Sequence, residues 1–369
     1  MNSEGVLEMT NNDKPFNLID GASGEATAVA REVNQQRKIS ANPELPLEER
    51  LEAYEDIFDS EVGDTTLVRA RNIERAVGLR QIYLKFEGGN PTGTQKDRIA
   101  FAQAMDALRR GYDTITVATC GNYGVAIALA AGFAGLSSRI YIPENYHANR
   151  LKEMTDLGAA IIRIKGDYER SVQVSSEEAL KHDFYDANPG GDNMLTQMRA
   201  YGRIATEIYD ELRDAPLAVT APVSNGTTLA GIYRGFLSLY RRGKISRMPR
   251  IVAGSSFRKN PIIQAYIHKT PSCEDLNPQK IHETSINEPL INWHSIDGDH
   301  ALDAIRQTGG WASDASDKAM RTFARLIREK EGLQVLPAST AGLIALMNKH
   351  TKEPLPNDRY VVVLTGRKS

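Results

Sequence analysis

The 369-residue chain has little cysteine, no long hydrophobic run and no excess of charge of one sign. Its two cysteines, Cys120 and Cys273, lie far apart, which excludes a disulfide scaffold and a cysteine-rich zinc module. The longest apolar run, about residues 125–136, is too short to span a bilayer, which takes about 20 residues. With 45 basic and 47 acidic side chains, the chain has no basic surplus that would favour nucleic acid or a membrane as partner.

Several motifs are absent as well. No GxGxxG or GxxxxGK[ST] follows a strand-like segment, so dinucleotide-binding and P-loop folds have no support. No GxSxG elbow and no HExxH occurs, and the seven histidines show no metal-ligand spacing, so we expect no metal site. The first residues, MNSEGVLEMTNND, lack the basic and apolar regions of a secretory signal. We therefore expect a cytoplasmic, soluble enzyme or binding protein.

Short apolar runs alternate with amphipathic segments along most of the chain, after a polar segment, residues 1–45, that we interpret as a partly ordered arm. The expected strands are 81–86, 114–118, 139–143, 160–164, 217–222, 250–253 and 360–364. The expected helices are 46–60, 96–111, 125–135, 148–158, 194–212, 229–243, 301–307 and 317–331. This order predicts an α/β fold of two three-layer domains with mostly parallel twisted sheets, whose ligands bind at the carboxyl ends of strands.

The loop NPTGTQKDR places Lys96 at the start of an expected helix. The positive end of the helix dipole disfavours an ammonium ion there, so a neutral amine is favoured. A neutral lysine amine forms a Schiff base with an aldehyde. Taken alone, Lys96 is better explained as a surface lysine in a capped loop.

Three other strand-to-helix or strand-end loops have chemistry that complements this amine. TCGNYG, residues 119–124, offers backbone N–H groups for a carboxylate, and SNGTT, residues 224–228, offers N–H groups and hydroxyls for a phosphate. Thr365 follows the apolar strand YVVVL and presents a hydroxyl that suits a ring nitrogen. Each loop alone also fits a tight turn or an ordinary helix cap. Together the four meet the needs of one cofactor, pyridoxal 5′-phosphate holding an amino acid.

The same motifs resemble those of the fold-type II pyridoxal-phosphate enzymes, and among these the chain is most similar to the threonine synthases. The likeness runs from about GDTTL, residues 63–67, to the end of the chain, and includes VLPASTAGLIAL and VVVLTGRK. The resemblance implies that Lys96 bonds the cofactor and moves protons. The cofactor-binding residues that it implies are Lys96, Asn122, Ser224, Asn225, Gly226, Thr227, Thr228 and Thr365.

The resemblance also implies a substrate site. Asn193 and Arg199 match the segment that binds the phosphate of O-phosphohomoserine in this family, and arginine suits a phosphate through its planar fork of donors. The residues implied near the substrate carboxylate are Thr119, Cys120, Gly121 and Tyr123.

The chain departs from the family mainly at its substrate-binding positions. Cys120 stands in place of a serine, Tyr123 in place of a small hydroxyl residue, and Met194 in place of a serine. Tyr201 and Leu336 stand where acidic residues are usual, Gln95 precedes the lysine in place of an aromatic or aliphatic residue, and Arg367 replaces a histidine. The cofactor is therefore better determined than the substrate.

The resemblance implies a threonine synthase-like lyase that converts O-phosphohomoserine to threonine and phosphate. The departures leave open a β-elimination or β-replacement enzyme acting on a serine- or cysteine-like amino acid, and a non-catalytic protein of the same fold. We expect a homodimer with a small amino-acid substrate. The expected division is an arm with a short helix (1–60), a large cofactor-binding domain (61–97 with 206–369) and a smaller mobile domain (98–205).

Overall fold

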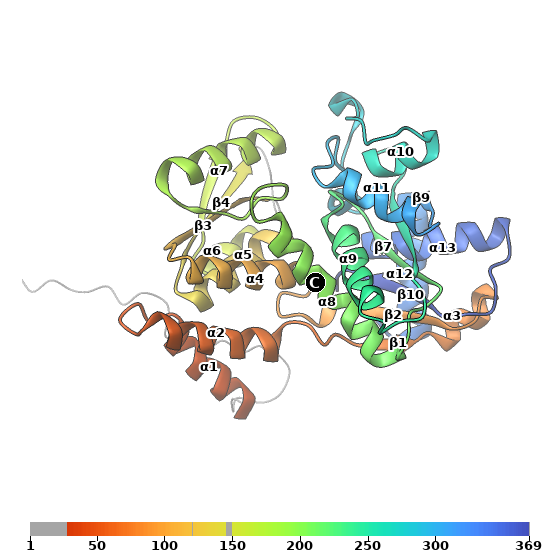
Figure 1. Cartoon of the computed structure of the whole chain (residues 1–369). Helices are drawn as coiled ribbons and strands as arrows, with labels where there is room; N and C mark the ends of the chain where they lie inside the picture. The colour runs from red at the N-terminus through yellow and green to blue at the C-terminus, as the bar shows by residue number, and fades with distance from the viewer. Residues whose placement is uncertain (1–27, 120, 145–149, 369) are drawn as a thin grey trace, which may run out of the picture. The chain divides into compact units, whose positions relative to one another are not determined.

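The computed structural model describes residues 28–119, 121–144 and 150–368, and Figure 1 shows its ribbon. Cys120 therefore lies outside the described residues. The chain forms two compact units: the smaller comprises the described residues up to Ser60 together with Ala104–Tyr185, and the larger comprises Glu61–Gln103 with the residues from Asp186 onward. These limits differ from the expected domains, which set the first 60 residues apart and gave 98–205 to the smaller domain.

The larger unit is built on a six-stranded sheet with the order β1-β2-β10-β7-β8-β9. Its strands are β1 (Leu67–Arg69), β2 (Ile82–Phe86), β7 (Ala218–Pro222), β8 (Arg250–Ser256), β9 (Ala312–Ala315) and β10 (Tyr360–Leu364). Only β1 is antiparallel to its neighbour; the other pairs are parallel. In register, Leu364 of β10 lies beside Phe86 of β2. The segments that follow β2, β10 and β7 therefore start from the same edge of the sheet, where ligands of such folds bind.

Helices cover both faces of this sheet (Figure 1). The helices α9 (Thr227–Arg241), α10 (Pro261–His268) and α11 (Gly298–Gln307) contact β8, and α11 contacts both of the others. On the other face, α13 (Ala341–Lys352) contacts β7 to β10 and packs on α12 (Asp317–Glu331), which contacts α3 (Arg71–Val77). The apolar side chains of α3, α12 and α13 and of the strands beneath them form one buried cluster.

The helix α8 (Met194–Leu212) lies against α9 in the larger unit. The two backbones approach closely, because a Cβ atom added at Gly235 of α9 would come within 2.4 Å of the carbonyl oxygen of Gly202 in α8. This close approach brings Tyr201 of α8 against the first turns of α9: a Cβ atom at Gly231 would lie 2.6 Å from the Tyr201 Cβ atom.

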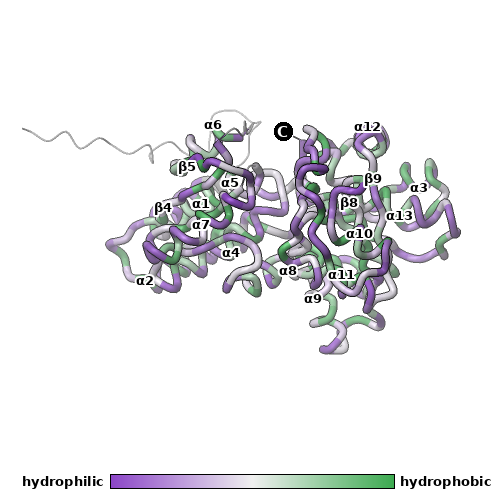
Figure 2. Tube along the Cα trace, turned by 90° about the horizontal axis from the view of Figure 1, so that it is seen from above, coloured by the Kyte–Doolittle hydropathy of each residue, from purple (hydrophilic) through white to green (hydrophobic). Residues whose placement is uncertain are grey.

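The smaller unit is built on a four-stranded sheet with the order β5-β4-β3-β6. Its strands are β3 (Thr114–Ala118), β4 (Ser137–Pro143), β5 (Ala160–Ile164) and β6 (Tyr185–Asp186), and β3, β4 and β5 run parallel. Besides the two N-terminal helices, this unit contains α5 (Asn122–Ala134), α6 (Leu151–Asp156), α7 (Tyr168–His182) and the end of α4 (Lys96–Arg109), whose residues up to Gln103 belong to the larger unit. Helix α5 is apolar on every side and almost wholly buried, as expected of a helix covered on all faces. Figure 2 shows hydrophobic stretches gathered inside each unit.

The segment before residue 46 is not simply an arm. Residues Ala28–Ser40 form helix α1, which contacts α5 and precedes α2 (Leu47–Glu61). The Ser40 hydroxyl, the Arg50 guanidinium and the Tyr54 hydroxyl donate hydrogen bonds to the carbonyl groups of residues 133, 134 and 130. These carbonyls lie in the last turns of α5, where no helical partner remains for most of them. The N-terminal helices thus complete the smaller unit.

The expected fold class is confirmed: the structure is α/β, with two largely parallel sheets covered by helices. Among the described residues, no helix has both the length and the apolar character needed to cross a membrane.

Candidate active site

The loop between β2 and α4 holds Lys96, which is the first residue of α4. Two contacts fix this loop to the residues that follow β10. Thr94 and Gly366 form an antiparallel bridge, and the Gln95 N–H donates to the carbonyl oxygen of Thr365 at 3.0 Å. These contacts hold the lysine loop against the end of β10, at Thr365.

Two further side chains shape the lysine loop. The Asp97 carboxylate accepts hydrogen bonds from the Thr92 N–H and hydroxyl at 2.9 and 2.7 Å, which closes the loop on itself. Arg367, which stands in place of the family's histidine, donates its N–H to the Gly93 carbonyl at 2.9 Å. Its guanidinium reaches the carbonyls of residues 88 and 91 at 3.3 Å. Arg367 therefore helps to hold the lysine loop in place.

The Lys96 amine has an unusual acidity. Burial lowers its pKa to about 8, against the opposing charge of Asp297. The helix dipole predicts a neutral amine here, but the larger cause of the lowered pKa is desolvation, which penalises the charged form. A lysine with this pKa is neutral in an appreciable fraction of molecules near pH 7.5, and the neutral form is the nucleophile.

The predicted phosphate loop runs from the end of β7 to the start of α9. Gly226 has a φ of +100°, and α9 begins at Thr227. The first N–H groups of a helix have no partner within it and are well placed to bind an anion. The loop is held from behind, because the Asn260 side chain donates to the Ser224 carbonyl at 3.0 Å and the Asn292 side chain donates to the Asn225 Oδ1 atom at 2.9 Å.

Asp297, which the sequence analysis did not single out, lies directly on this loop. Its backbone N–H donates to the Asn225 carbonyl at 2.9 Å, and its carboxylate accepts a short hydrogen bond from the Thr227 hydroxyl. Asp297 precedes helix α11 at the N-cap position, yet its side chain makes no cap hydrogen bond to that helix. The sequence Asp-Gly-Asp before an apolar helix signals a cap, and nothing in it points to a second helix as the partner.

Tyr201 brings another polar group toward the start of α9. It is fully buried, and its hydroxyl, near the Thr228 side chain, has no hydrogen-bond partner of acceptable geometry in the described part of the chain. Burial raises the pKa of this hydroxyl, so it keeps its proton and acts as a donor. A buried donor without a partner is costly, which suggests that a bound group satisfies it.

Thr365 lies beside a second hydroxyl at the end of β10. The Ser339 and Thr365 hydroxyl oxygens are 3.1 Å apart, and Ser339 also accepts the Gly366 N–H at 3.1 Å. Ser339 is fully buried and lies in the short turn Pro337–Thr340 before α13. The end of the strand therefore carries a neutral pair of hydroxyls, with no carboxylate in these contacts. The sequence analysis quoted Ser339 within VLPASTAGLIAL but gave it no role.

The predicted carboxylate turn belongs to the smaller unit. Thr119 and Tyr123 are buried, and the Gly121 N–H reaches the Thr119 hydroxyl at 3.5 Å. The Asn122 side-chain oxygen accepts a hydrogen bond from Arg150 at 2.7 Å, and Arg150 in turn pairs with Glu153. Asn122 is therefore held in a fixed orientation by an arginine that the sequence analysis did not identify.

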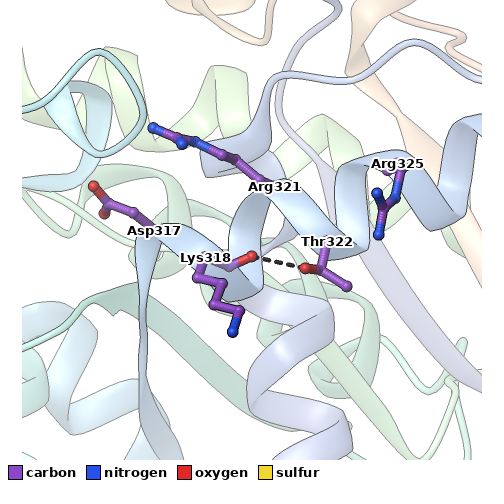
Figure 3. A pocket seen from close by; sticks show the side chains of 5 residues that line it. All are labelled: Asp317, Lys318, Arg321, Thr322 and Arg325. Atoms are coloured by element: carbon purple, nitrogen blue, oxygen red, sulfur yellow. Dashed lines mark hydrogen bonds between the residues drawn. The ribbon is translucent and has the colours of Figure 1, made fainter.

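Asn193 and Arg199 lie at the start of α8. Asn193 is buried, and its amide donates to the Asp186 carbonyl at 2.5 Å, whereas Arg199 is exposed. A surface groove of about 510 Å³ lies elsewhere on the larger unit and is lined by residues of α12 alone (Figure 3). None of the predicted site residues lines this groove.

Comparison with known proteins identifies the family. The family model described as "Pyridoxal-phosphate dependent enzyme" matches residues 58–366. The chain belongs to this family of pyridoxal-phosphate dependent enzymes. It is 28% identical to the threonine synthase of Methanocaldococcus jannaschii over 307 residues, which cover 82% of this chain and 74% of the relative.

Solved structures agree with the fold. The maize serine racemase superposes with a TM-score of 0.70 at 18% identity, covering 86% of this chain and 94% of that one. The processed form of threonine deaminase isoform 2 from Solanum lycopersicum also superposes with a TM-score of 0.70, at 15% identity, covering 87% of this chain and 90% of that one.

The residues of the larger unit fit pyridoxal phosphate. The Lys96 amine suits the aldehyde, the start of α9 with the unpartnered Tyr201 hydroxyl suits the phosphate, and the Ser339–Thr365 pair suits an unprotonated ring nitrogen. When bound, the cofactor supplies a ring that withdraws electrons from the carbon next to a substrate's amino group. A neutral hydroxyl partner does not force protonation of that ring.

The Gly226→Ala substitution is expected to weaken both folding and cofactor binding. An added Cβ atom would lie 2.5 Å from the Asp297 carbonyl oxygen, at a φ of +100°. Positive φ alone costs a residue with a side chain about 1–3 kcal/mol. We expect a larger loss of unfolding free energy than this, and a dissociation constant for pyridoxal phosphate raised roughly tenfold or more, about 1.4 kcal/mol.

Gly78→Ala is the matched control, because Gly78 has a φ of +76° and an added Cβ atom meets nothing within 4 Å. Urea unfolding and an absorbance titration with pyridoxal phosphate measure the two effects. Equal losses in the two variants would show that contact with Asp297 does not matter at Gly226.

Proposed function

We propose that this enzyme is a threonine synthase-like lyase that converts O-phosphohomoserine and water to threonine and phosphate. The similarity to a threonine synthase over 82% of the chain is the observation that carries the proposal. The structure contributes the lysine amine with a pKa of about 8 and an exposed arginine, Arg199, at the position that the family uses for the substrate phosphate.

In this proposal each residue has a separate task. The Lys96 Nζ atom removes the proton from the substrate carbon next to the amino group, and its lowered pKa makes it a suitable base near neutral pH. Arg199 binds the leaving phosphate, since a guanidinium matches two phosphate oxygens. The overall reaction breaks the bond between the γ-carbon and the phosphate oxygen and adds water at the β-carbon, so no oxidant or reductant is needed.

The test is to incubate the purified holoenzyme with O-phosphohomoserine and measure phosphate and threonine. We expect equal amounts of both. If Arg199 binds the phosphate, Arg199→Ala raises the KM for this substrate roughly tenfold to a hundredfold, as loss of a charge-assisted pair of about 1.5–3 kcal/mol predicts. Arg241→Ala, an exposed arginine at the end of α9, is the control and should leave KM unchanged. Equal effects of both substitutions would contradict the role of Arg199.

A second function is a β-elimination or β-replacement reaction on a serine- or cysteine-like amino acid. One contact favours it: the Asn193 amide, which the resemblance assigns to the substrate phosphate, is already bonded to the Asp186 carbonyl. Met194 beside it has replaced a hydroxyl residue. If O-acetylserine or serine shifts the cofactor's absorption spectrum and O-phosphohomoserine does not, this second function replaces the first.

The homodimer also remains a prediction. Size-exclusion chromatography with light scattering measures the mass of the particle, and a mass near the 40.7 kDa of one chain would contradict it.

A further inference from the structure

A buried carboxylate sits where the cofactor's phosphate is expected. Asp297 is 2% exposed, and its carboxylate takes the hydroxyl hydrogen of Thr227, the first residue of α9. The start of a helix that follows a β-strand in this fold is also the place where an anion binds. Asp297 therefore already uses one of the donors that a phosphate group would need.

The position of Asp297 is fixed by its backbone. Its N–H bonds the Asn225 carbonyl at 2.9 Å, and its own carbonyl lies so close to Gly226 that a Cβ atom there would approach to 2.5 Å. The residue cannot move far from the loop without breaking these contacts. Its side chain also leaves its own helix uncapped in favour of Thr227.

The charged groups that face Asp297 come from two elements. Lys96 at the start of α4 and His300 in the first turn of α11 both act on its charge, and the Thr227 hydroxyl of α9 bonds it. All three groups lower the pKa of Asp297. Burial has the larger effect and raises this pKa above its ordinary value. A phosphate carries a further charge of about −1.5 to −2, and two buried anions at one helix start repel each other strongly.

We propose that Asp297 accepts a proton when the cofactor's phosphate binds, so that the phosphate replaces the Asp297 carboxylate as the anion at the start of α9. In the loaded protein Asp297 is a neutral carboxylic acid. Retention of the cofactor then weakens as pH rises. The sign follows from linkage: a group whose pKa is raised by binding favours binding at low pH, and the gain is lost as pH rises through the pKa of the bound form. This inference concerns cofactor binding and stands whether or not the enzyme acts on O-phosphohomoserine.

The test uses pyridoxine 5′-phosphate, which has the ring and the phosphate but no aldehyde, so that bonding to Lys96 does not enter. Its dissociation constant for cofactor-free protein is measured by fluorescence from about pH 5.5 to about pH 8.5. Uptake of one proton gives an affinity that falls up to about tenfold per pH unit. We expect Asp297→Asn to bind the probe more tightly at the upper end of this range and to lose this part of the pH dependence. Titration of the probe's own phosphate is common to both proteins and cancels in the comparison.

Two control variants separate Asp297 from its neighbours. Asp299→Asn removes a carboxylate on the same helix that accepts a hydrogen bond from the Cys273 N–H at 2.7 Å. The Thr227 hydroxyl donates to Asp297 instead. His300→Gln removes the titratable group beside Asp297. Asp299→Asn should keep the wild-type pH profile. His300→Gln removes a charge that acts on Asp297, which can shift the profile along the pH axis, but the fall in affinity with rising pH should remain. If Asp297→Asn keeps that profile, or if His300→Gln removes it, the proposal is wrong.

Calorimetry keeps the proposal testable in the unaltered protein. Binding of pyridoxine 5′-phosphate at about pH 7.5, in buffers of different ionisation enthalpy, gives the number of protons taken up. We expect about one more proton for the phosphorylated probe than for pyridoxine, which lacks the phosphate. An equal number for the two probes would overturn the proposal, because the proton would then not be linked to the phosphate.

Discussion

Lys96→Ala is expected to yield a folded protein that retains no pyridoxal phosphate after dialysis and has lost at least about 10³-fold in turnover. The reason is the double task proposed for this amine, which both bonds the cofactor and moves the substrate proton. Its surroundings are built for it: the loop that carries it is fixed to the end of β10, and burial lowers its pKa to about 8. The first measurement is the visible absorption of the dialysed protein. The second is reduction with borohydride, which fixes the cofactor to the lysine that holds it, followed by mass spectrometry to locate that lysine.

Lys318→Ala provides the control, because Lys318 is an exposed lysine of the same unit on the groove of α12 (Figure 3). It should keep the absorption band and the activity. A band that survives in Lys96→Ala, or a trapped group that maps to another lysine, would show that the cofactor's partner has been misassigned. A normal melting curve for Lys96→Ala is needed to separate loss of chemistry from loss of fold.

Segments with strong periodicity were predicted well from the sequence. The strands Thr114–Ala118, Ala160–Ile164 and Tyr360–Leu364 and the helices Met194–Leu212 and Asp317–Glu331 have the expected bounds. Apolar runs between turn residues fix such strands, and one-sided apolar patterns fix such helices, since local burial decides both.

Elements whose formation depends on distant contacts were missed. Helix α1 has a polar sequence, and it is ordered by packing on α5, about 90 residues away in the chain. The short strand β9 and helix α10 have no clear period and form because they lie against β8. Contacts of α1 with α5 assign the described residues before 61 to the smaller unit, and the expected division into domains stays a prediction.

In the candidate site, too, residues that depend on distant contacts were missed. Lys96, the residues 224–228 and Thr365 were found because each lies in a loop after an apolar strand, where the topology brings ligands. Asp297 lies about 70 residues from its partner Thr227, and the sequence around it predicts only a helix cap. Its relation to the site depends on the packing of α11 beside α9, which no local pattern records.

Arg98 in the first turn of α4 joins a buried network of ion pairs. Its guanidinium bonds the Glu87 carboxylate at 2.5 and 2.9 Å and the Glu207 carboxylate at 2.6 and 2.8 Å. Lys85 also contacts Glu207, so two cations balance two carboxylates in a nearly dry interior. Burial works to raise the pKa of Glu207, but Arg98 and Lys85 outweigh it and hold the pKa at about 2.

Arg98→Met is accordingly expected to cost about 3–5 kcal/mol of unfolding free energy, the usual effect of breaking a buried ion pair. The loss arises because the fully buried Glu87 carboxylate would be left without its guanidinium partner. In the wild type, the Glu207 carboxylate contributes stability above about pH 4.5, and this contribution is lost as pH falls toward about 2. The variant should therefore lose stability at neutral pH and respond less to acid, which urea unfolding at several pH values measures.

Two comparisons decide whether lost charge balance causes the lower stability of Arg98→Met. Arg325→Met removes an exposed arginine whose pair with Glu329 spans 3.9 Å, and it should cost less than about 1 kcal/mol. Adding Glu87→Gln to Arg98→Met removes the orphaned charge and should restore part of the lost stability. If the double variant is no more stable than Arg98→Met, the loss comes from packing. Arg98 follows Lys96 by two residues in α4. We therefore expect that Arg98→Met also loosens the start of this helix and weakens cofactor binding together with stability.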